Sequence, residues 1–352
     1  MLRKADSQDW LTRDGSAVDG GTTLSALGLS LLPQPAVHVT AEPYLVPSDP
    51  VFGAQWHLIN TGQTGGTAGA DINVASVWDD YTGDGVLIGI IDDGVEHTHA
   101  DLSANYDTSL DFDARDYDLD SAPGTSSDNH GTAVAGIAGA SANNGTGVVG
   151  AAFDATITAF RMGYGSAGSL AQERLVLQQE ADVLNNSWGY GGFFYDDFTT
   201  AAFAQQGASV QNAVETGRDG LGTVWVFAAG NSGDVGQDTN YHSYTSSRFT
   251  ISVGAVDHDG NLASFSTPGA PNLVSTPGVN VTTTDRSAGA GYAPGDVTTI
   301  SGTSFSSPLT SGVVALLLEA NPDLGYRDVQ EILAYSARLT GGSGGVGTQR
   351  RL

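Results

Sequence analysis

The stretch Val86-Leu-Ile-Gly-Ile-Ile-Asp-Asp-Gly94 decides the fold of this chain. Its apolar residues follow one another without the alternation of a half-exposed strand, so the run predicts a strand that is buried on both faces. Such strands occur mainly in parallel sheets that helices cover on both sides. Two aspartates and a turn glycine follow the apolar run, at the strand end where these folds usually place their sites.

The same texture recurs along the chain. Further apolar runs without alternation lie at 155–160, 182–186, 223–228 and 249–256. Helical patterns lie between or after them, near 130–142, 169–179, 198–217, 304–320 and 326–337. Strands that alternate with helices predict an α/β fold, with a doubly wound, mainly parallel sheet flanked by helices.

We expect three segments along the chain. Residues 1–46 are rich in Gly, Ser, Thr and Pro without a sustained period, which predicts a leader or linker with little core of its own. Residues 47–340 form the α/β domain and can bury a substantial core. Residues 341–352 begin with a Gly-rich run that is typical of a flexible linker.

The charge of the chain bears on its partners. Thirteen basic and 39 acidic side chains give a formal net charge of −26. This charge argues against nucleic acid or an anionic membrane as a partner and favours cations, a metal or peptides, although it also serves solubility. The absence of cysteine from the sequence excludes disulfides and zinc-thiolate sites. No apolar stretch reaches membrane-spanning length, and no signal-peptide core follows Met1.

Three polar residues stand at points where strands end or helices begin. Asp92 ends the quoted strand and could orient an imidazole, although Asp-Gly more often marks a plain turn. His130 opens a run of small residues, where a general base or a structural histidine would fit. Asn231 lies in Ala-Gly-Asn-Ser-Gly after another strand, where its amide could donate to an oxyanion or simply form a turn.

The run Gly302-Thr-Ser-Phe-Ser-Ser-Pro308 leads several hydroxyls into a predicted buried helix. One hydroxyl there could cap the helix, and Thr303 is the better candidate for that role. Ser304 could be a nucleophile, because free N–H groups at a helix start stabilise negative charge. We expect Pro308 to lie in the first helical turn, where its missing N–H costs little.

The order of these residues along the chain is informative. Asp92, His130, Asn231 and Ser304, in these contexts and in this order, resemble the signature sites of subtilisin-like serine proteases. The surrounding stretches resemble the kexin and furin branch of that family, at 49–56, 91–102, 142–145 and 318–321. The resemblance runs from about Asp49 to Ala337.

The resemblance implies acyl transfer through a covalent intermediate. Ser304 would attack a peptide carbonyl while His130 takes its proton, and Asp92 would orient the imidazole and stabilise its charged form. The Asn231 side chain and the Ser304 N–H would meet the oxyanion.

Acidic residues gather near the predicted site. Asp111, Asp113, Asp116, Asp118 and Asp120 lie within ten positions, a density that predicts either a solvated loop or a bound cation. Oxygen ligands of this kind suit calcium. The resemblance implies a tight Ca²⁺ site made of Asp49, Asp101 and Asn144 with the carbonyls of Ser141, Thr146 and Val148, and a second made of Asp113, Asp118 and Asp120. A further family site is not expected, because Gly192 and Thr267 stand where acids would be.

Specificity is where the chain departs from the convertases. The resemblance implies substrate contacts from Asp93, Ser187, Trp188, Gly189 and His242. Convertases select paired basic residues through carboxylates, but His242 stands at the position of the pocket-floor acid and the run 187–192 lacks acids. We therefore expect a broader endopeptidase with a mild preference for cationic substrates.

These observations favour a secreted, calcium-stabilised, monomeric serine endopeptidase that acts on proteins or peptides and leaves the cell by a route without a visible signal peptide. A catalytically silent peptide-binding module with the same fold is an alternative, against which the intact set of four residues counts. A general serine hydrolase such as an esterase is a third, but no Gly-x-Ser-x-Gly surrounds Ser304. The folded propeptide of the family and the β-rich domain of the convertases do not fit outside 49–337, so we expect a fragment or an unusual bacterial form.

Overall fold

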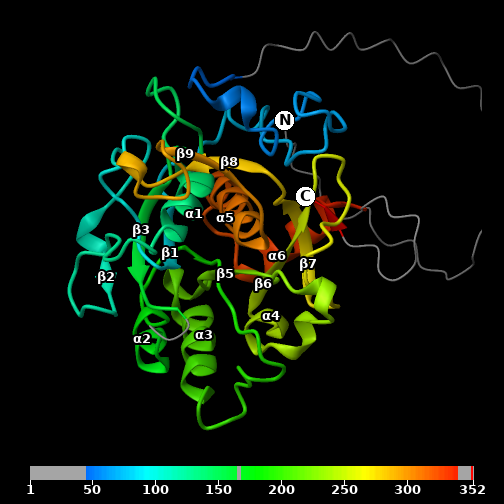
Figure 1. Cartoon of the computed structure of the whole chain (residues 1–352). Coiled ribbons are helices and arrows are strands. Elements are labelled where there is room, and N and C mark those ends of the chain that lie inside the picture. Colours follow the sequence, from blue (N-terminus) through cyan, green and yellow to red (C-terminus); the bar gives the residue numbers. More distant parts are fainter. Residues whose placement is uncertain (1–44, 165–167, 340–349, 352) are drawn as a thin grey trace, which may run out of the picture. The chain divides into compact units, whose positions relative to one another are not determined.

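A computed structural model describes residues 45–164, 168–339 and 350–351 (Figure 1). The leader or linker expected at 1–46 lies almost entirely outside the described residues, as does most of the linker expected at 341–352. The exception is Arg350–Arg351, which pairs with strands at the edge of the sheet. Those two residues therefore belong to the sheet and not to a free linker.

The centre of the fold is one sheet, in the order β10-β11-β7-β6-β5-β4-β1-β3-β2. From β7 to β2 its seven strands are parallel. Its strands are β1 (Leu87–Asp92), β2 (Phe112–Asp113), β3 (Thr156–Arg161), β4 (Val183–Asn186), β5 (Val224–Ala228), β6 (Thr250–Val256), β7 (Asn272–Pro277), β10 (Arg338–Leu339) and β11 (Arg350–Arg351). A separate antiparallel pair is formed by β8 (Val281–Thr284) and β9 (Val297–Ile300).

The helices cover both faces of this sheet. They are α1 (His130–Gly139), α2 (Leu170–Val176), α3 (Ala204–Thr216), α4 (Ser243–Ser246), α5 (Thr303–Ala320) and α6 (Tyr326–Ser336). Every strand and helix expected from the sequence is present with bounds within three residues, except that the helix expected at 198–217 begins only at Ala204. The α/β fold with a doubly wound parallel sheet is therefore confirmed. None of the helices in the described part of the chain combines the length and the apolar character needed to cross a bilayer.

The uninterrupted apolar run of β1 is explained by burial on two sides. Ile88 and Ile90 belong to the core that α1 and α5 cover, whereas Ile91 belongs to the core beneath α2 and α3. Helices α1 and α5 also contact each other (Figure 1). This packing holds the first residues of α1 and α5 near the carboxyl ends of β1, β4 and β5, where the candidate site lies.

Candidate active site

Asp92 and His130 are brought together by the end of β1 and the start of α1. The imidazole Nδ1 lies 2.9 Å from Oδ1 and 3.0 Å from Oδ2 of Asp92. Burial opposes the charged imidazole, but the carboxylates of Asp92 and Asp93 raise the pKa of His130 to about 9. Nε2 of His130 has no hydrogen-bond partner among the described residues, and the side chain lines a wide cleft. This is the geometry of an oriented proton acceptor.

The Asp93 carboxylate accepts hydrogen bonds from the N-terminus of helix α1. Its Oδ2 accepts the N–H of His130 at 3.1 Å and its Oδ1 accepts the N–H of Gly131 at 2.8 Å. Burial and the neighbouring charge of Asp92 raise the pKa of Asp93 to about 7. Asp93 also lines the wide cleft, so the predicted substrate-binding residue has a structural role as a helix cap.

Ser304 is tied to the end of β4 by two reciprocal hydrogen bonds. Its Oγ donates to the Ser187 carbonyl at 3.2 Å, and the Ser187 hydroxyl donates to the Ser304 carbonyl at 2.8 Å. That carbonyl is free because Pro308, four residues later, has no N–H to donate. Pro308 is the sixth residue of α5 and lies beyond its first turn, so the expected position was wrong. The Ser187 hydroxyl offsets the hydrogen bond that the proline removes.

The hydrogen-bonded chain predicted for Asp92, His130 and Ser304 is only partly formed. Among the described residues, no hydrogen bond joins the Ser304 hydroxyl to His130. The two still lie near each other, because the ring of Phe305, the next residue, is 5.6 Å from the His130 ring between centroids. The structure thus shows the Asp92–His130 contact, and it shows the serine hydroxyl turned toward Ser187.

Asn231 follows β5, and Thr303 fixes the orientation of its amide. Its Oδ1 accepts the N–H of Thr303 at 2.8 Å and the Thr303 hydroxyl at 3.0 Å. The Thr303 hydroxyl in turn accepts the N–H of Gly230 at 3.1 Å. Thr303 is therefore not the helix cap that we expected, because it is the first helical residue and Gly302 is the N-cap. With its oxygen held in this way, Asn231 has its NH₂ group available to the adjoining pocket.

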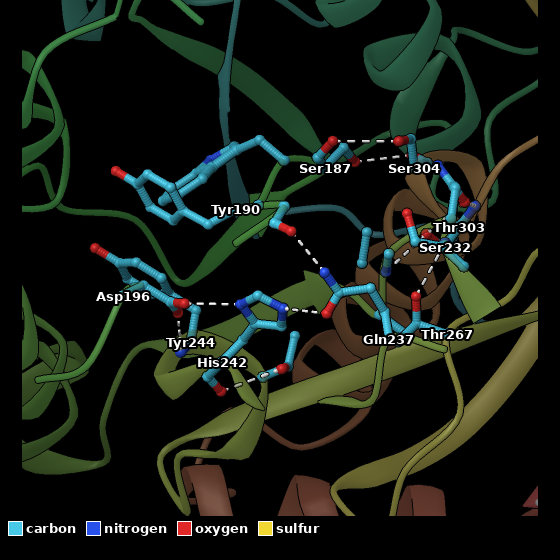
Figure 2. A pocket seen from close by; sticks show the side chains of 18 residues that line it. Ser187, Tyr190, Asp196, Ser232, Gln237, His242, Tyr244, Thr267, Thr303 and Ser304 are labelled. Carbon is cyan, nitrogen blue, oxygen red and sulfur yellow. Dashed lines mark hydrogen bonds and ion pairs between the residues drawn. The ribbon is translucent and has the colours of Figure 1, made fainter. Parts of the chain in front are cut away.

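A pocket of about 220 Å³ adjoins Ser304 and Asn231 (Figure 2). The predicted substrate-binding residues Ser187, Trp188, Gly189 and His242 all line it, whereas Asp93 lines the wider cleft beside His130. Ser187, Trp188 and Gly189 line both hollows, so this segment is shared between them.

Two pocket residues were not predicted from the sequence. His242 Nδ1 lies 2.7 Å from Oδ1 of Asp196, and its Nε2 lies 3.1 Å from Oε1 of Gln237. Both partners line the pocket. No motif marked either one: Asp196 follows three exposed aromatic residues (193–195), and Gln237 lies in a Gly- and Asp-rich loop.

The residues of the first expected calcium site gather around two buried carboxylates, Asp49 and Asp101. Asp49 accepts the N–H groups of Asn143 and Asn144 at 2.6 and 3.1 Å. Asp101 accepts from the Asn144 amide at 3.2 Å, from the Thr146 hydroxyl at 3.1 Å and from the Val148 N–H at 2.9 Å. The Ser141 N–H donates to the Asp101 carbonyl at 2.8 Å.

Close packing of Gly147 and the lack of basic neighbours both characterise the first expected calcium site. A Cβ at Gly147, whose φ is +36°, would lie 1.8 Å from Oδ2 of Asp101, so the loop wraps the carboxylate closely. No basic side chain of the described residues lies within ion-pair distance of Asp49 or Asp101. Asp49 and Asp101, two buried carboxylates that both contact the loop at 143–148 and have no basic partner among the described residues, are suitable donors for a divalent cation.

The second expected calcium site receives no support from the structure. Asp113 forms a buried ion pair with Arg161, the last residue of β3, and its other oxygen accepts the N–H groups of 115 and 116. Asp118 accepts the N–H of Asp120, whose carboxylate lies 3.4 Å from His97. The described residues contain no group of three or more His, Cys, Asp or Glu side chains placed to hold a metal ion.

A protein-family model and several known proteins resemble this chain. A model described as the subtilase family matches residues 83–350. The PC3-like endoprotease variant B of Hydra vulgaris is 39% identical over 313 residues, which are 84% of this chain and 42% of the relative. Human neuroendocrine convertase 2 is 35% identical over 315 residues, covering 83% of this chain and 47% of the relative. The chain therefore spans less than half the length of these relatives.

Solved structures show the same fold. The serine protease of Aeromonas sobria superposes with a TM-score of 0.78 at 25% identity, covering 85% of this chain and 59% of that one. A protease of Pseudoalteromonas arctica gives 0.67 at 27% identity, covering 84% of this chain and 94% of that one. The match of the family model over most of the chain, together with the relatives, shows that the chain belongs to the subtilase family of serine peptidases.

Proposed function

We propose that this chain is a serine endopeptidase that hydrolyses peptide bonds through an acyl-enzyme, with Asp92, His130 and Ser304 as its catalytic residues. The observation that carries the proposal is the hydrogen bond between Asp92 and His130, formed where α5 brings the Ser304 helix start beside the imidazole. The names of the relatives, an endoprotease and a convertase, support the same reaction.

The first step requires the Ser304 hydroxyl to turn from the Ser187 carbonyl toward Nε2 of His130. A rotation about one side-chain bond would do this, and catalytic hydrogen bonds commonly tighten only when substrate binds. His130 would take the hydroxyl proton as Oγ attacks the carbonyl carbon, and would then donate it to the leaving amine. Asp92 would hold the tautomer with the proton on Nδ1 and stabilise the imidazolium.

The negative charge formed in this step needs donors that are already in position. The NH₂ group of Asn231 and the N–H of Ser304 supply two, because Thr303 holds the Asn231 oxygen and α5 begins at Thr303. Hydrolysis of the acyl-enzyme then repeats the step with water as nucleophile and His130 as base. Substrate backbone would run past Ser187–Gly189, the segment that lines both hollows.

Labelling with a fluorophosphonate tests this proposal. We expect the protein to label, Ser304→Ala to lose labelling, and Ser301→Ala to retain it. Ser301 is a matched control, since it is an exposed serine only three residues away that bonds to Asn280. Absence of labelling in folded, calcium-supplied protein would favour a peptide-binding module without catalysis.

We further propose that the protein is stabilised by calcium, held by the side chains of Asp49, Asp101 and Asn144 and by the carbonyls of Ser141, Thr146 and Val148. Bound calcium would neutralise the two buried carboxylates. Asn144 would have to turn its amide oxygen inward, because its Nδ2 now faces Asp101.

Chelation tests the calcium proposal. Calcium at 100 times its dissociation constant adds about 2.7 kcal/mol to the free energy of unfolding, which for a domain of this size raises the melting temperature by about 4 °C. We expect EDTA to remove this increment from the wild type but to have little effect on Asp101→Asn. Asp118→Asn serves as the control for a general charge effect, and an equal response of both variants would contradict the site.

A further inference from the structure

The pocket beside Ser304 contains a row of three polar side chains, Asp196, His242 and Gln237 (Figure 2). The Asp196 and His242 side chains are 1% and 11% exposed. Asp196 Oδ1 contacts the imidazole at 2.7 Å, and its Oδ2 accepts the N–H of Tyr244 at 3.3 Å. Both carboxylate oxygens are therefore engaged.

Both ring nitrogens of His242 have hydrogen-bond partners in the pocket. Gln237 Nε2 donates to the Gly191 carbonyl at 2.6 Å, which fixes the amide so that Oε1 faces the imidazole. Nδ1 faces a carboxylate and Nε2 faces an amide oxygen, so both ring nitrogens face acceptors. A neutral imidazole has one donor, and only the doubly protonated ring satisfies both contacts. In that form His242 and Asp196 make an ion pair in the pocket lining.

No free carboxylate remains for a cationic substrate side chain in this pocket. Among the described pocket-lining residues the acidic one is Asp196, and His242 neutralises it. The nearby Glu173 lines the wider cleft, and its two oxygens accept the hydroxyls of Tyr190 and Tyr244. A lysine or arginine entering the pocket would lose water and meet the imidazolium without gaining an anionic partner.

We propose that His242 determines primary specificity by neutralising Asp196. With His242 in place the pocket takes an uncharged side chain on the acyl side of the cleaved bond, in contrast to the mild cationic preference that the net charge led us to expect. Without it, Asp196 becomes the receptor for arginine or lysine. The inference rests on the proposed peptidase function and deepens it, and it assigns Asp196 a role as a masked specificity residue.

The first test compares His242→Asn with the double variant His242→Asn/Asp196→Asn. Asparagine removes the positive charge and keeps a polar side chain, and the double variant removes the unmasked carboxylate as well. Peptides differing only in arginine or glutamine on the acyl side of the cut report kcat/KM. We expect the arginine-to-glutamine ratio to rise about tenfold or more in His242→Asn, as a charge-assisted hydrogen bond would produce, and to fall back in the double variant. If His242 had a purely structural role, the substitution would lower kcat/KM for both peptides by the same factor. An unchanged arginine-to-glutamine ratio would overturn the proposal.

The second test needs no catalysis. Benzamidine, a small amidinium cation, is titrated by calorimetry into Ser304→Ala and into the same protein carrying His242→Asn or, should that variant unfold, His242→Gln. Binding should tighten about tenfold or more when the histidine is absent. Equal affinities would refute the proposal even if the enzyme is active. Tighter binding by a protein that never labels with fluorophosphonate would uphold the masked acid and reject the peptidase function instead.

Discussion

The described part of the molecule contains two Asp–His pairs with a buried carboxylate at the same end of its sheet, and they differ in two respects. Asp92 contacts His130 at 2.9 Å, and Asp196 contacts His242 at 2.7 Å. The second ring nitrogen of His130 has no hydrogen-bond partner among the described residues, whereas that of His242 is taken by Gln237. The His130 side chain is also more exposed, at 24% against 11%.

This difference teaches that an Asp–His contact does not by itself make a base. In both pairs a carboxylate on Nδ1 orients the ring. Only a ring whose other nitrogen is free can accept a proton from a nucleophile. The first pair is thus suited to proton transfer, and the second is suited to holding a fixed positive charge in the pocket.

The largest expected effect is the loss of kcat on replacing His130, which replacing His242 should not cause. Replacing His130 with alanine should lower kcat by about 10⁶-fold on every substrate, as loss of the base does in comparable triads. His242→Asn should instead redistribute kcat/KM among substrates, because His242 touches neither Ser304 nor His130. Steady-state kinetics on the arginine and glutamine peptides measures both. If the His130 variant kept most of its activity, or if the His242 variant lost it on all peptides, the distinction would be wrong.

A smaller effect is expected where the loop after β5 meets α5. Asn231→Ala should lower kcat by about 10²–10³-fold with little change in KM, because the amide donates only to the developing oxyanion. Thr303→Val should lower kcat by only about tenfold, because it removes one of the two hydrogen bonds that orient the amide. The kcat of Asn231→Ala should therefore be well below that of Thr303→Val. A rise in KM with unchanged kcat would show that Asn231 binds the ground state instead.

The fold and four of the candidate site residues could be predicted from the sequence, because short local motifs indicate them. The fold follows from apolar runs such as 86–91, since a strand buried on both faces needs no polar alternation. Asp92, His130, Asn231 and Ser304 are recognisable because each stands in a short motif at the end of a strand or the start of a helix.

What the sequence does not predict depends on partners distant along the chain. Asp196 and Gln237 line the pocket and contact His242 from positions 46 and 5 residues away along the chain. The acidic run of 111–120 suggests a metal, but Arg161 at the end of β3 forms ion pairs with Asp113 and Asp116. A count of aspartates cannot show that an arginine 48 positions away lies among them.

The same limit applies to the start of α5. Thr303 reads as a helix cap in isolation, yet its hydroxyl bonds to Asn231 and to the Gly230 N–H. Pro308 is the sixth residue of α5, and the Ser304 carbonyl that its missing N–H leaves free accepts the Ser187 hydroxyl instead. Both corrections come from tertiary contacts that replace the local hydrogen bonds a propensity argument assumes.

The smallest expected effect is a displacement of the pH profile, and it tests whether only the first pair takes part in proton transfer. His130 must be neutral to accept the Ser304 proton, and the carboxylates of Asp92 and Asp93 raise its pKa to about 9. The rate should therefore increase with pH through this region and not near 6.5. Removing the charge with Asp93→Asn destabilises the imidazolium, so the acid limb of kcat/KM should move to lower pH.

His242→Asn provides the matched control for that profile. It removes the other imidazole, and no hydrogen bond among the described residues joins His242 to Asp92 or His130, so its acid limb should coincide with that of the wild type. Rates measured on the glutamine peptide keep the substrate uncharged and leave the enzyme as the titrating partner. The contrary result would be an acid limb that moves with His242→Asn and stays in place with Asp93→Asn. Protonation of the Asp196–His242 pair would then limit turnover, and the roles assigned to the two histidines would have to be exchanged.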